Sequence, residues 1–178
     1  MAHERSLPYN LSPMAQIYES DSYTPTQTDL YFNLVFEKIF GAYLERGFYV
    51  PLAGVSRRNS DGLARTRVVK SCGVGQFLHP RLEPDNRFDP FAVAITQSDG
   101  IELGYLPARV AREATDAVRG GVKLGAIFRC RAYHPITEKT VGAIILLLFL
   151  RDWDGPFYCT PEIGAAMDHQ FHRYGIDR

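Results

Sequence analysis

The sequence predicts a mainly β protein of the α+β class, built as a small barrel with a few helices. Several short apolar stretches are separated by turn signals such as Ser98–Gly100, a pattern typical of antiparallel strands. Only two modest helical segments interrupt these stretches, and a small barrel would leave few open sheet edges. Apolar residues make up 46% of the 178 residues, which is enough for the packed core of one ordinary domain with extensions.

The strongest helical pattern lies near the N-terminus, over residues 27–47, where Gly47 can end the helix. The apolar residues that recur there at helical spacing are Phe32, Val35, Phe36, Ile39, Phe40, Tyr43 and Leu44. We expect this amphipathic, aromatic face to dock on the protein's own core, with contacts to a partner or a second copy through residues 30–44 as the alternative. Residues 1–26 mix prolines with polar residues and are expected to be extended or partly disordered.

The barrel domain is predicted over residues 48–152. Its expected strands are 48–56, 76–84, 91–97, 101–107, 123–136 and 141–150. A helix is expected at 108–121, and residues 63–72 fit either a short helix or a bend. In the tail, residues 153–178, a short helix is expected at 160–171.

The net charge is zero, but its distribution along the chain is uneven. Residues 1–50 carry −3, residues 51–152 carry +5 and residues 153–178 carry −2. A mildly basic middle is compatible with a nucleic-acid surface. The longest apolar run, Val141–Leu150, is about half as long as a membrane-spanning helix must be. With no secretory signal evident at the N-terminus, we expect a cytoplasmic protein that does not contact a membrane.

Cysteines and histidines give little sign of a metal site. Cys72, Cys130 and Cys159 lie too far apart for a zinc knuckle, and we expect them to be reduced and packed as small apolar groups. His169 and His172 form an HxxH pair without an evident third ligand, so we interpret them as a surface pair.

Enzyme motifs are also absent from the sequence. It contains no phosphate-binding GxxxxGK[ST], no HExxH and no nucleophile with a nearby base. Asp85 and Asp89 could form a carboxylate pair for nuclease chemistry, but only Glu83 lies near them and no lysine follows at active-site spacing. We therefore expect neither catalysis nor a cofactor.

The segment EPDNRFDP, residues 83–90, concentrates turn-forming residues directly before an apolar strand. Asp and Asn side chains cap turns through hydrogen bonds to the backbone, and proline fixes φ. On that reading the segment is only a turn, with Phe88 free to enter the core. The alternative is that the same cluster of Asp, Asn, Arg and Phe binds a ligand.

Four blocks of the sequence resemble the HIRAN domain family, in order and in spacing. They are LAGVSRRNSDG (52–62), LEPDNRFDPFAVAI (82–95), IELGYLPARVARE (101–113) and AIILLLFL (143–150). The resemblance implies a six-stranded barrel similar to OB and SH3 folds, with short helices. In fork-remodelling helicases the family's domain binds the free 3′ end of single-stranded DNA. There an aspartate bonds the terminal hydroxyl, aromatic rings stack on bases, and basic groups meet phosphate.

The resemblance implies roles for individual residues of this sequence. Asp89 matches the aspartate that recognises the 3′-hydroxyl, and Asn86 matches an asparagine of the pocket. Phe88 falls where the family often has tyrosine, which keeps a stacking face and loses a hydroxyl. Tyr105, within GYLP, matches a position that faces the nucleic acid. A buried carboxylate would also reject a continuous strand, because it repels phosphate.

The arginines around this region depart in part from the family pattern. Arg57 and Arg58 stand where many relatives carry an aromatic residue or a basic–aromatic pair. A guanidinium group in place of the ring can still stack or grip phosphate, but it does not do so equally well. Ala108 stands where helicase members carry a basic residue, and Arg109 follows it. The residues predicted to bind nucleic acid are Arg57, Arg58, Asn59, Arg65, Asp85, Asn86, Arg87, Phe88, Asp89, Tyr105 and Arg109.

These observations favour a non-catalytic module that binds ends of single-stranded DNA in repair, at replication forks or in defence, with RNA as a further ligand to consider. A protein-interaction or scaffold subunit that uses the aromatic helix is the first alternative. A metal-dependent hydrolase or nuclease is the second.

Overall fold

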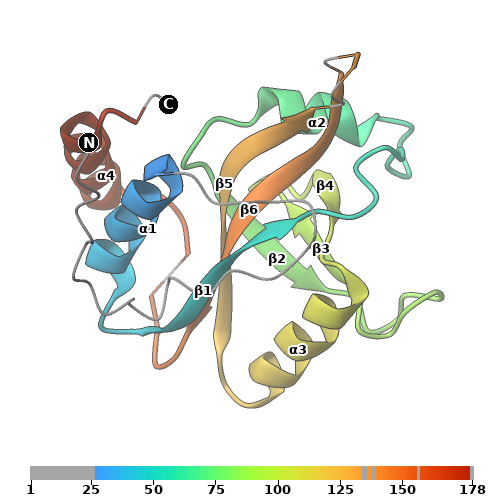
Figure 1. The fold of residues 1–178 in the computed structure, drawn as a ribbon. Helices are drawn as coiled ribbons and strands as arrows, with labels where there is room; N and C mark the ends of the chain where they lie inside the picture. The colour runs from blue at the N-terminus through green and yellow to red at the C-terminus, as the bar shows by residue number, and fades with distance from the viewer. Residues whose placement is uncertain (1–26, 134–135, 138, 156, 177–178) are drawn as a thin grey trace, which may run out of the picture.

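The computed structural model describes residues 27–133, 136–137, 139–155 and 157–176, and the predicted extended segment 1–26 lies outside these residues (Figure 1). The helices are α1 (Gln27–Phe40), α2 (Arg65–Ser71), α3 (Ala108–Arg119) and α4 (Pro161–Tyr174). The strands are β1 (Leu44–Pro51), β2 (Phe77–Leu82), β3 (Val93–Thr96), β4 (Glu102–Tyr105), β5 (Lys123–Tyr133) and β6 (Thr140–Leu150). The protein is mainly β, as the sequence predicts.

The six strands form one antiparallel sheet in the order β1-β6-β5-β2-β3-β4. The sheet curls into a half-barrel because the chain beyond β1 returns to β4. There the N–H of Ala53 donates to the carbonyl of Tyr105 at 2.8 Å, and the N–H of Tyr105 donates to Ala53 at 2.9 Å. This confirms the predicted six-stranded barrel.

Strand β6 lies between β1 and β5 and is covered on both faces, which explains why residues 141–150 are almost all apolar. Side chains 145, 147 and 149 belong to the barrel core, whereas side chains 144, 146, 148 and 150 belong to a second core outside the barrel. Successive side chains of a strand point to opposite faces, so a strand covered on both faces needs apolar residues throughout.

Helices α1 and α4 build the second core on the outer face of the sheet, where they lie beside each other (Figure 1). Phe32, Phe36 and Phe40 of α1 are fully buried. The ring of Phe36 packs against Phe77 of β2 and Phe171 of α4, with centroids 6.4 and 6.3 Å away. This confirms that the aromatic helix docks on its own barrel. Among the described residues, no helix has the length and apolar character needed to cross a membrane.

The predicted end of the first helix was wrong. The helix ends at Phe40, seven residues before Gly47, and β1 begins at Leu44. A Cβ at Gly41 would collide with the carbonyl of Glu37, so glycine permits the tight turn that follows. The apolar residues at positions 43 and 44 fit helical spacing, but pairing of Leu44 with Leu150 in β6 extends the ladder and draws the chain into the sheet.

The three cysteines are free, as expected, but their burial differs. Cys72 is buried and Cys130 is half-buried, whereas Cys159 is exposed and does not pack as an apolar group. Burial raises the pKa of the Cys72 and Cys130 thiols, which keeps both in the neutral form at pH 7.

Candidate nucleic-acid interface

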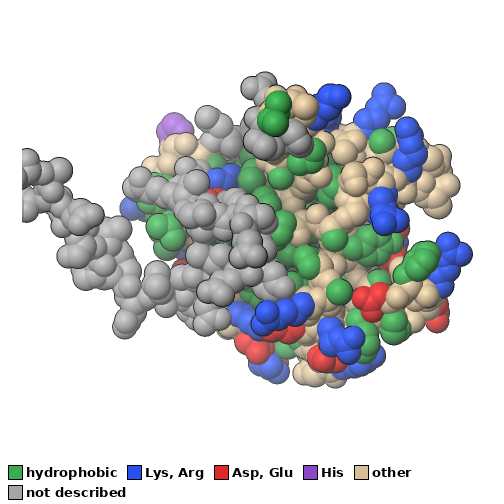
Figure 2. Space-filling view, turned by 45° about the vertical axis from the view of Figure 1, so that its right-hand side comes forward, with side chains coloured by type: hydrophobic (Ala, Val, Ile, Leu, Met, Phe, Trp, Pro, Cys, Tyr) green, Lys and Arg blue, Asp and Glu red, His purple; other side chains and the backbone are tan. Residues whose placement is uncertain are grey.

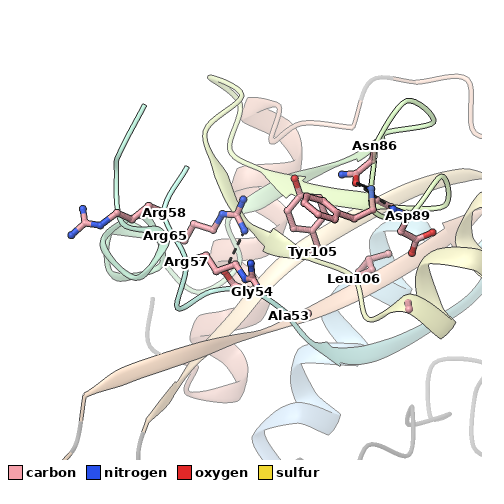
Figure 3. A pocket seen from close by; sticks show the side chains of 12 residues that line it. Ala53, Gly54, Arg57, Arg58, Arg65, Asn86, Asp89, Tyr105 and Leu106 are labelled. Atoms are coloured by element: carbon pink, nitrogen blue, oxygen red, sulfur yellow. Dashed lines mark hydrogen bonds between the residues drawn. The ribbon is translucent and has the colours of Figure 1, made fainter. Parts of the chain in front are cut away.

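A groove of about 660 Å³ opens on the barrel where the loop after β1, the turn after β2, strand β4 and the start of α3 meet. Figure 3 shows the arginines of the first loop on one side and Asn86 and Asp89 on the other, with Tyr105 between them. The groove is lined by Ala53, Gly54, Arg57, Arg58, Arg65, Asn86, Phe88, Asp89, Ala92, Tyr105, Leu106 and Ala108.

The segment EPDNRFDP forms a capped turn and also lines the groove. Asn86 Oδ1 accepts the N–H groups of Phe88 at 3.0 Å and Asp89 at 3.4 Å. Asp89 Oδ1 accepts the N–H of Phe91 at 2.9 Å. Within the described part of the chain, the second carboxylate oxygen of Asp89 has no hydrogen-bond partner, so it remains available to a donor. The segment is therefore a capped turn, and its residues Asn86, Phe88 and Asp89 also line the groove.

Phe88 does not enter the core, although the interpretation of the segment as a turn alone allowed it to. Its side chain is 82% exposed, and the guanidinium of Arg87 lies 4.5 Å from its ring centroid. An exposed aromatic ring at the rim of a groove offers a stacking surface, which suits a nucleic-acid base.

Arg57 and Arg58 supply positive charge on the opposite side of the groove. Both are exposed, and Arg58 Nη1 donates to the carbonyl of Gly62 at 2.8 Å. Figure 2, which turns the right-hand side of Figure 1 forward, shows Lys and Arg side chains over this side of the molecule with acidic and apolar side chains between them. The surface is mixed, and the positive charge at the groove comes from a few local arginines.

Arg65 lines the groove but is held in place by protein contacts. Its side chain is 8% exposed and donates to Glu102 Oε2 at 2.7 Å and to Asn59 Oδ1 at 2.7 Å. Its guanidinium also lies 5.0 Å from the ring centroid of Tyr105. A Cβ at Gly54, where φ is +71°, would press on Arg65 Nη1 at 3.2 Å. Arg65 therefore packs against the ring of Tyr105, and glycine at position 54 leaves room for the guanidinium.

Beneath the groove lies an ion-pair network that the sequence analysis missed. Arg81 Nη2 donates to Glu83 Oε1 and to Glu102 Oε1, each at 2.7 Å. Tyr105 Oη lies 3.1 Å from Glu83 Oε2, to which it donates. The signal is the register of the sheet: Ala94 of β3 pairs with Arg81 of β2 and with Tyr105 of β4, which places these two residues level with each other on the strands that flank β3.

The network shifts the pKa values of three groups, and that of Arg81 is raised, chiefly by its hydrogen bond to Glu83. Burial alone would raise the pKa of Glu83, but hydrogen bonds from Arg81, Asn86 and Tyr105 outweigh it and the pKa is lowered. The pKa of Tyr105 is raised, first by burial and then by the charges of Glu102 and Glu83. At pH 7 Glu83 is therefore an anion and Tyr105 a neutral donor, which is the state that their hydrogen bond requires.

Seven of the eleven predicted residues line the groove, and four do not. Asn59 supports Arg65, and its Nδ2 donates to the carbonyl of Glu102 at 3.0 Å. Asp85, Arg87 and Arg109 are exposed and lie outside the lining residues. Within the described ranges, no three or more His, Cys, Asp or Glu side chains gather as metal ligands, and His169 and His172 are both exposed on α4.

The HIRAN domain family model matches residues 46–134, half of the chain and the part that contains every groove residue. The chain belongs to the HIRAN domain family. The HIRAN domain here is joined to α1 and α4, which lie outside the matched residues. A comparison with curated proteins found no match.

Three solved structures are similar to this HIRAN protein. A protein from Lactobacillus plantarum has a TM-score of 0.46 at 16% identity, over 58% of this chain and 91% of its own. The crystal structure of the HIRAN domain of human HLTF has a TM-score of 0.46 at 11% identity, over 75% and 92%. The NMR structure of the HLTF HIRAN domain in its DNA-bound conformation has a TM-score of 0.40 at 13% identity, over 80% and 99%.

Proposed function

We propose that this protein is a non-catalytic module that binds single-stranded DNA at its 3′-hydroxyl end, in repair, at replication forks or in defence. One observation carries the proposal. A single groove combines a carboxylate oxygen without a partner among the described residues, an exposed aromatic ring and two exposed arginines, contributed by Asp89, Phe88, Arg57 and Arg58.

Asp89 supplies the selectivity for an end. A terminal 3′-hydroxyl is a hydrogen-bond donor that an internal phosphodiester lacks, and an ionised carboxylate accepts it in a charge-assisted bond. A phosphate at the same place would be repelled by the carboxylate. The Asx turn fixes the other oxygen of Asp89 on the N–H of Phe91, so the accepting oxygen is already oriented before the strand arrives.

Phe88, Arg57 and Arg58 supply affinity without reading sequence. Stacking of a base on an aromatic ring contributes about 1–3 kcal/mol and tolerates any base. The guanidinium groups attract phosphate and release counterions, so their contribution falls as salt rises. Arg87 lies over one face of the Phe88 ring, which leaves the other face for a base.

Membership of the HIRAN family supports a nucleic-acid ligand, since the HIRAN domain of human HLTF has a DNA-bound conformation. An RNA strand ends in the same 3′-hydroxyl and carries a 2′-hydroxyl besides. The binding assay therefore includes an RNA strand of the same sequence.

The test is fluorescence anisotropy with one short labelled strand in three forms. The first carries a 3′-hydroxyl, the second a 3′-phosphate, and the third is circular and has no end. We expect the hydroxyl strand to bind about ten-fold or more tightly than the other two. Equal affinity for all three would show that the groove does not recognise ends.

A further inference from the structure

Glu83 joins one wall of the groove to its floor, although it does not line the groove itself. Its Oε2 accepts Nδ2 of Asn86 at 2.9 Å and the hydroxyl of Tyr105 at 3.1 Å. Its Oε1 accepts Arg81 at 2.7 Å. One carboxylate therefore joins the turn after β2 to strand β4.

The contact with Asn86 extends to the backbone of the recognition turn. Because the Nδ2 of Asn86 is bonded to Glu83, its Oδ1 points the other way and accepts the N–H groups of Phe88 and Asp89. If the amide of Asn86 rotated, those two N–H groups would lose their acceptor and the carboxylate of Asp89 would lose its fixed place.

The contact with Tyr105 fixes the floor of the groove. The hydroxyl of this tyrosine is bonded to Glu83, and its ring is packed against the guanidinium of Arg65. Arg81 then links Glu83 to Glu102, the carboxylate that holds Arg65. Glu83 thus lies on the path of contacts between Phe88 at the rim of the groove and Arg65.

We propose that Glu83 is a positioning residue that determines the preference of the groove for a hydroxyl end, acting through Asn86 and Tyr105. The proposal rests on the proposed function for its ligand. Glu83→Gln keeps the shape of the side chain but replaces the carboxylate by a neutral amide. At least one of the three contacts is then lost, and the others weaken because they are no longer charge-assisted.

The first readout is selectivity, measured as the Kd for the 3′-phosphate strand divided by the Kd for the 3′-hydroxyl strand. We expect Glu83→Gln to lower this ratio about ten-fold while affinity for the phosphate strand changes little. The matched control is Glu45→Gln. Glu45 forms an ion pair of 2.7 Å with Arg151, and neither residue lines the groove. This control should keep the wild-type ratio, and an unchanged ratio in Glu83→Gln would overturn the proposal.

The second readout needs no DNA and separates this proposal from the proposed function. In amide hydrogen exchange by NMR, we expect the N–H groups of Phe88 and Asp89 to exchange faster in Glu83→Gln, but not in Glu45→Gln. If the wild type shows no end preference, the proposed function fails, while faster exchange would still show that Glu83 positions the turn. Unchanged exchange in Glu83→Gln would overturn the positioning role of Glu83.

A third variant keeps the test valid if Glu83→Gln does not fold. Tyr105→Phe removes only the hydroxyl, which donates to Glu83 at 3.1 Å and lies 3.4 Å from Glu102 Oε2, and it keeps the ring in the groove. We expect it to lower the selectivity ratio by about three-fold, because one of the three donors is lost. A wild-type ratio in this variant would contradict the positioning role.

Discussion

At the scale of single residues, Asn86 and Asp89 each serve the turn and the groove. Asn86 caps two N–H groups through Oδ1 while its Nδ2 bonds Glu83, and Asp89 caps Phe91 with one oxygen while the other remains available. Turn chemistry was evident from the sequence, and so was the polar cluster. The pairing of Glu83 with Tyr105 was not, because it depends on strand register across a gap of 22 residues.

Phe88 allows a test of stacking that barely perturbs the fold. Because the ring is 82% exposed, we expect Phe88→Ala to change the free energy of unfolding by less than about 0.5 kcal/mol. Affinity for single strands should fall by about 1–3 kcal/mol, measured by anisotropy. Tyr133→Ala, which removes a 55% exposed ring at the end of β5, is the control and should leave affinity unchanged. A Phe88→Ala protein that binds as the wild type does would exclude stacking there.

The hydrogen bonds of Glu83 should make the protein less stable as the pH falls. Its pKa in the folded protein lies below the ordinary value of 4.5 for a glutamate, so its contribution to stability is full above that pH and is lost as the pH falls through the folded pKa. We expect the difference in Tm between the wild type and Glu83→Gln to be largest at pH 7 and to shrink below about pH 4.5. A difference that grew with acidification would contradict the assigned hydrogen bonds.

At the scale of elements, the sequence predicted all six strands, and a helix at 108–121 that the structure ends at Arg119, because apolar runs and Gly-containing turns are local signals. The end of α1 was missed because residues 43 and 44 satisfy both periods, and the choice depends on a β6 partner about 100 residues away. The residues that the two loops contribute to the groove were predicted, because each loop is a continuous stretch of sequence. The contacts of Tyr105 at its floor depend on the register of β2, β3 and β4, which local patterns do not specify.

The docking of α1 on the sheet can be measured. Phe36 is fully buried among rings of α1, β2 and α4, so we expect Phe36→Ala to lower the free energy of unfolding by about 3–5 kcal/mol. Leu34→Ala, which truncates a 45% exposed side chain on the same helix, should cost less than about 1 kcal/mol. Urea denaturation of both variants measures the difference. Similar small losses would mean that the aromatic face of α1 does not pack on the barrel.

At the scale of the whole molecule, a formally neutral chain carries its positive charge in the middle, with +5 over residues 51–152. Association with DNA should therefore be assisted by charge only modestly. If Arg57 and Arg58 engage about two phosphates, the slope of log K against log salt is about −1.4 for a single strand. Raising salt from roughly 50 to 200 mM should then weaken binding about seven-fold, measured by anisotropy. An affinity that did not change with salt would mean that the DNA binds to another surface.

The carboxylate of Asp89 is the part of the account on which end recognition depends, and the chain contains a matched control for it. Asp99 Oδ1 accepts the N–H of Ile101 at 3.0 Å, as Asp89 Oδ1 accepts that of Phe91 at 2.9 Å, but Asp99 lies outside the groove. Asn caps such turns much as Asp does, so neither Asp89→Asn nor Asp99→Asn should cost much stability.

The most direct measurement is the Kd of both variants for the 3′-hydroxyl and 3′-phosphate strands. Asp89→Asn should lose about 1.5–3 kcal/mol on the hydroxyl strand, roughly ten- to hundred-fold. On the phosphate strand its affinity should hold or improve, because the repelling charge is gone. Asp99→Asn should match the wild type on both. Equal loss by Asp89→Asn on both strands, or no loss on either, would contradict end recognition and leave residues 83–90 as a turn.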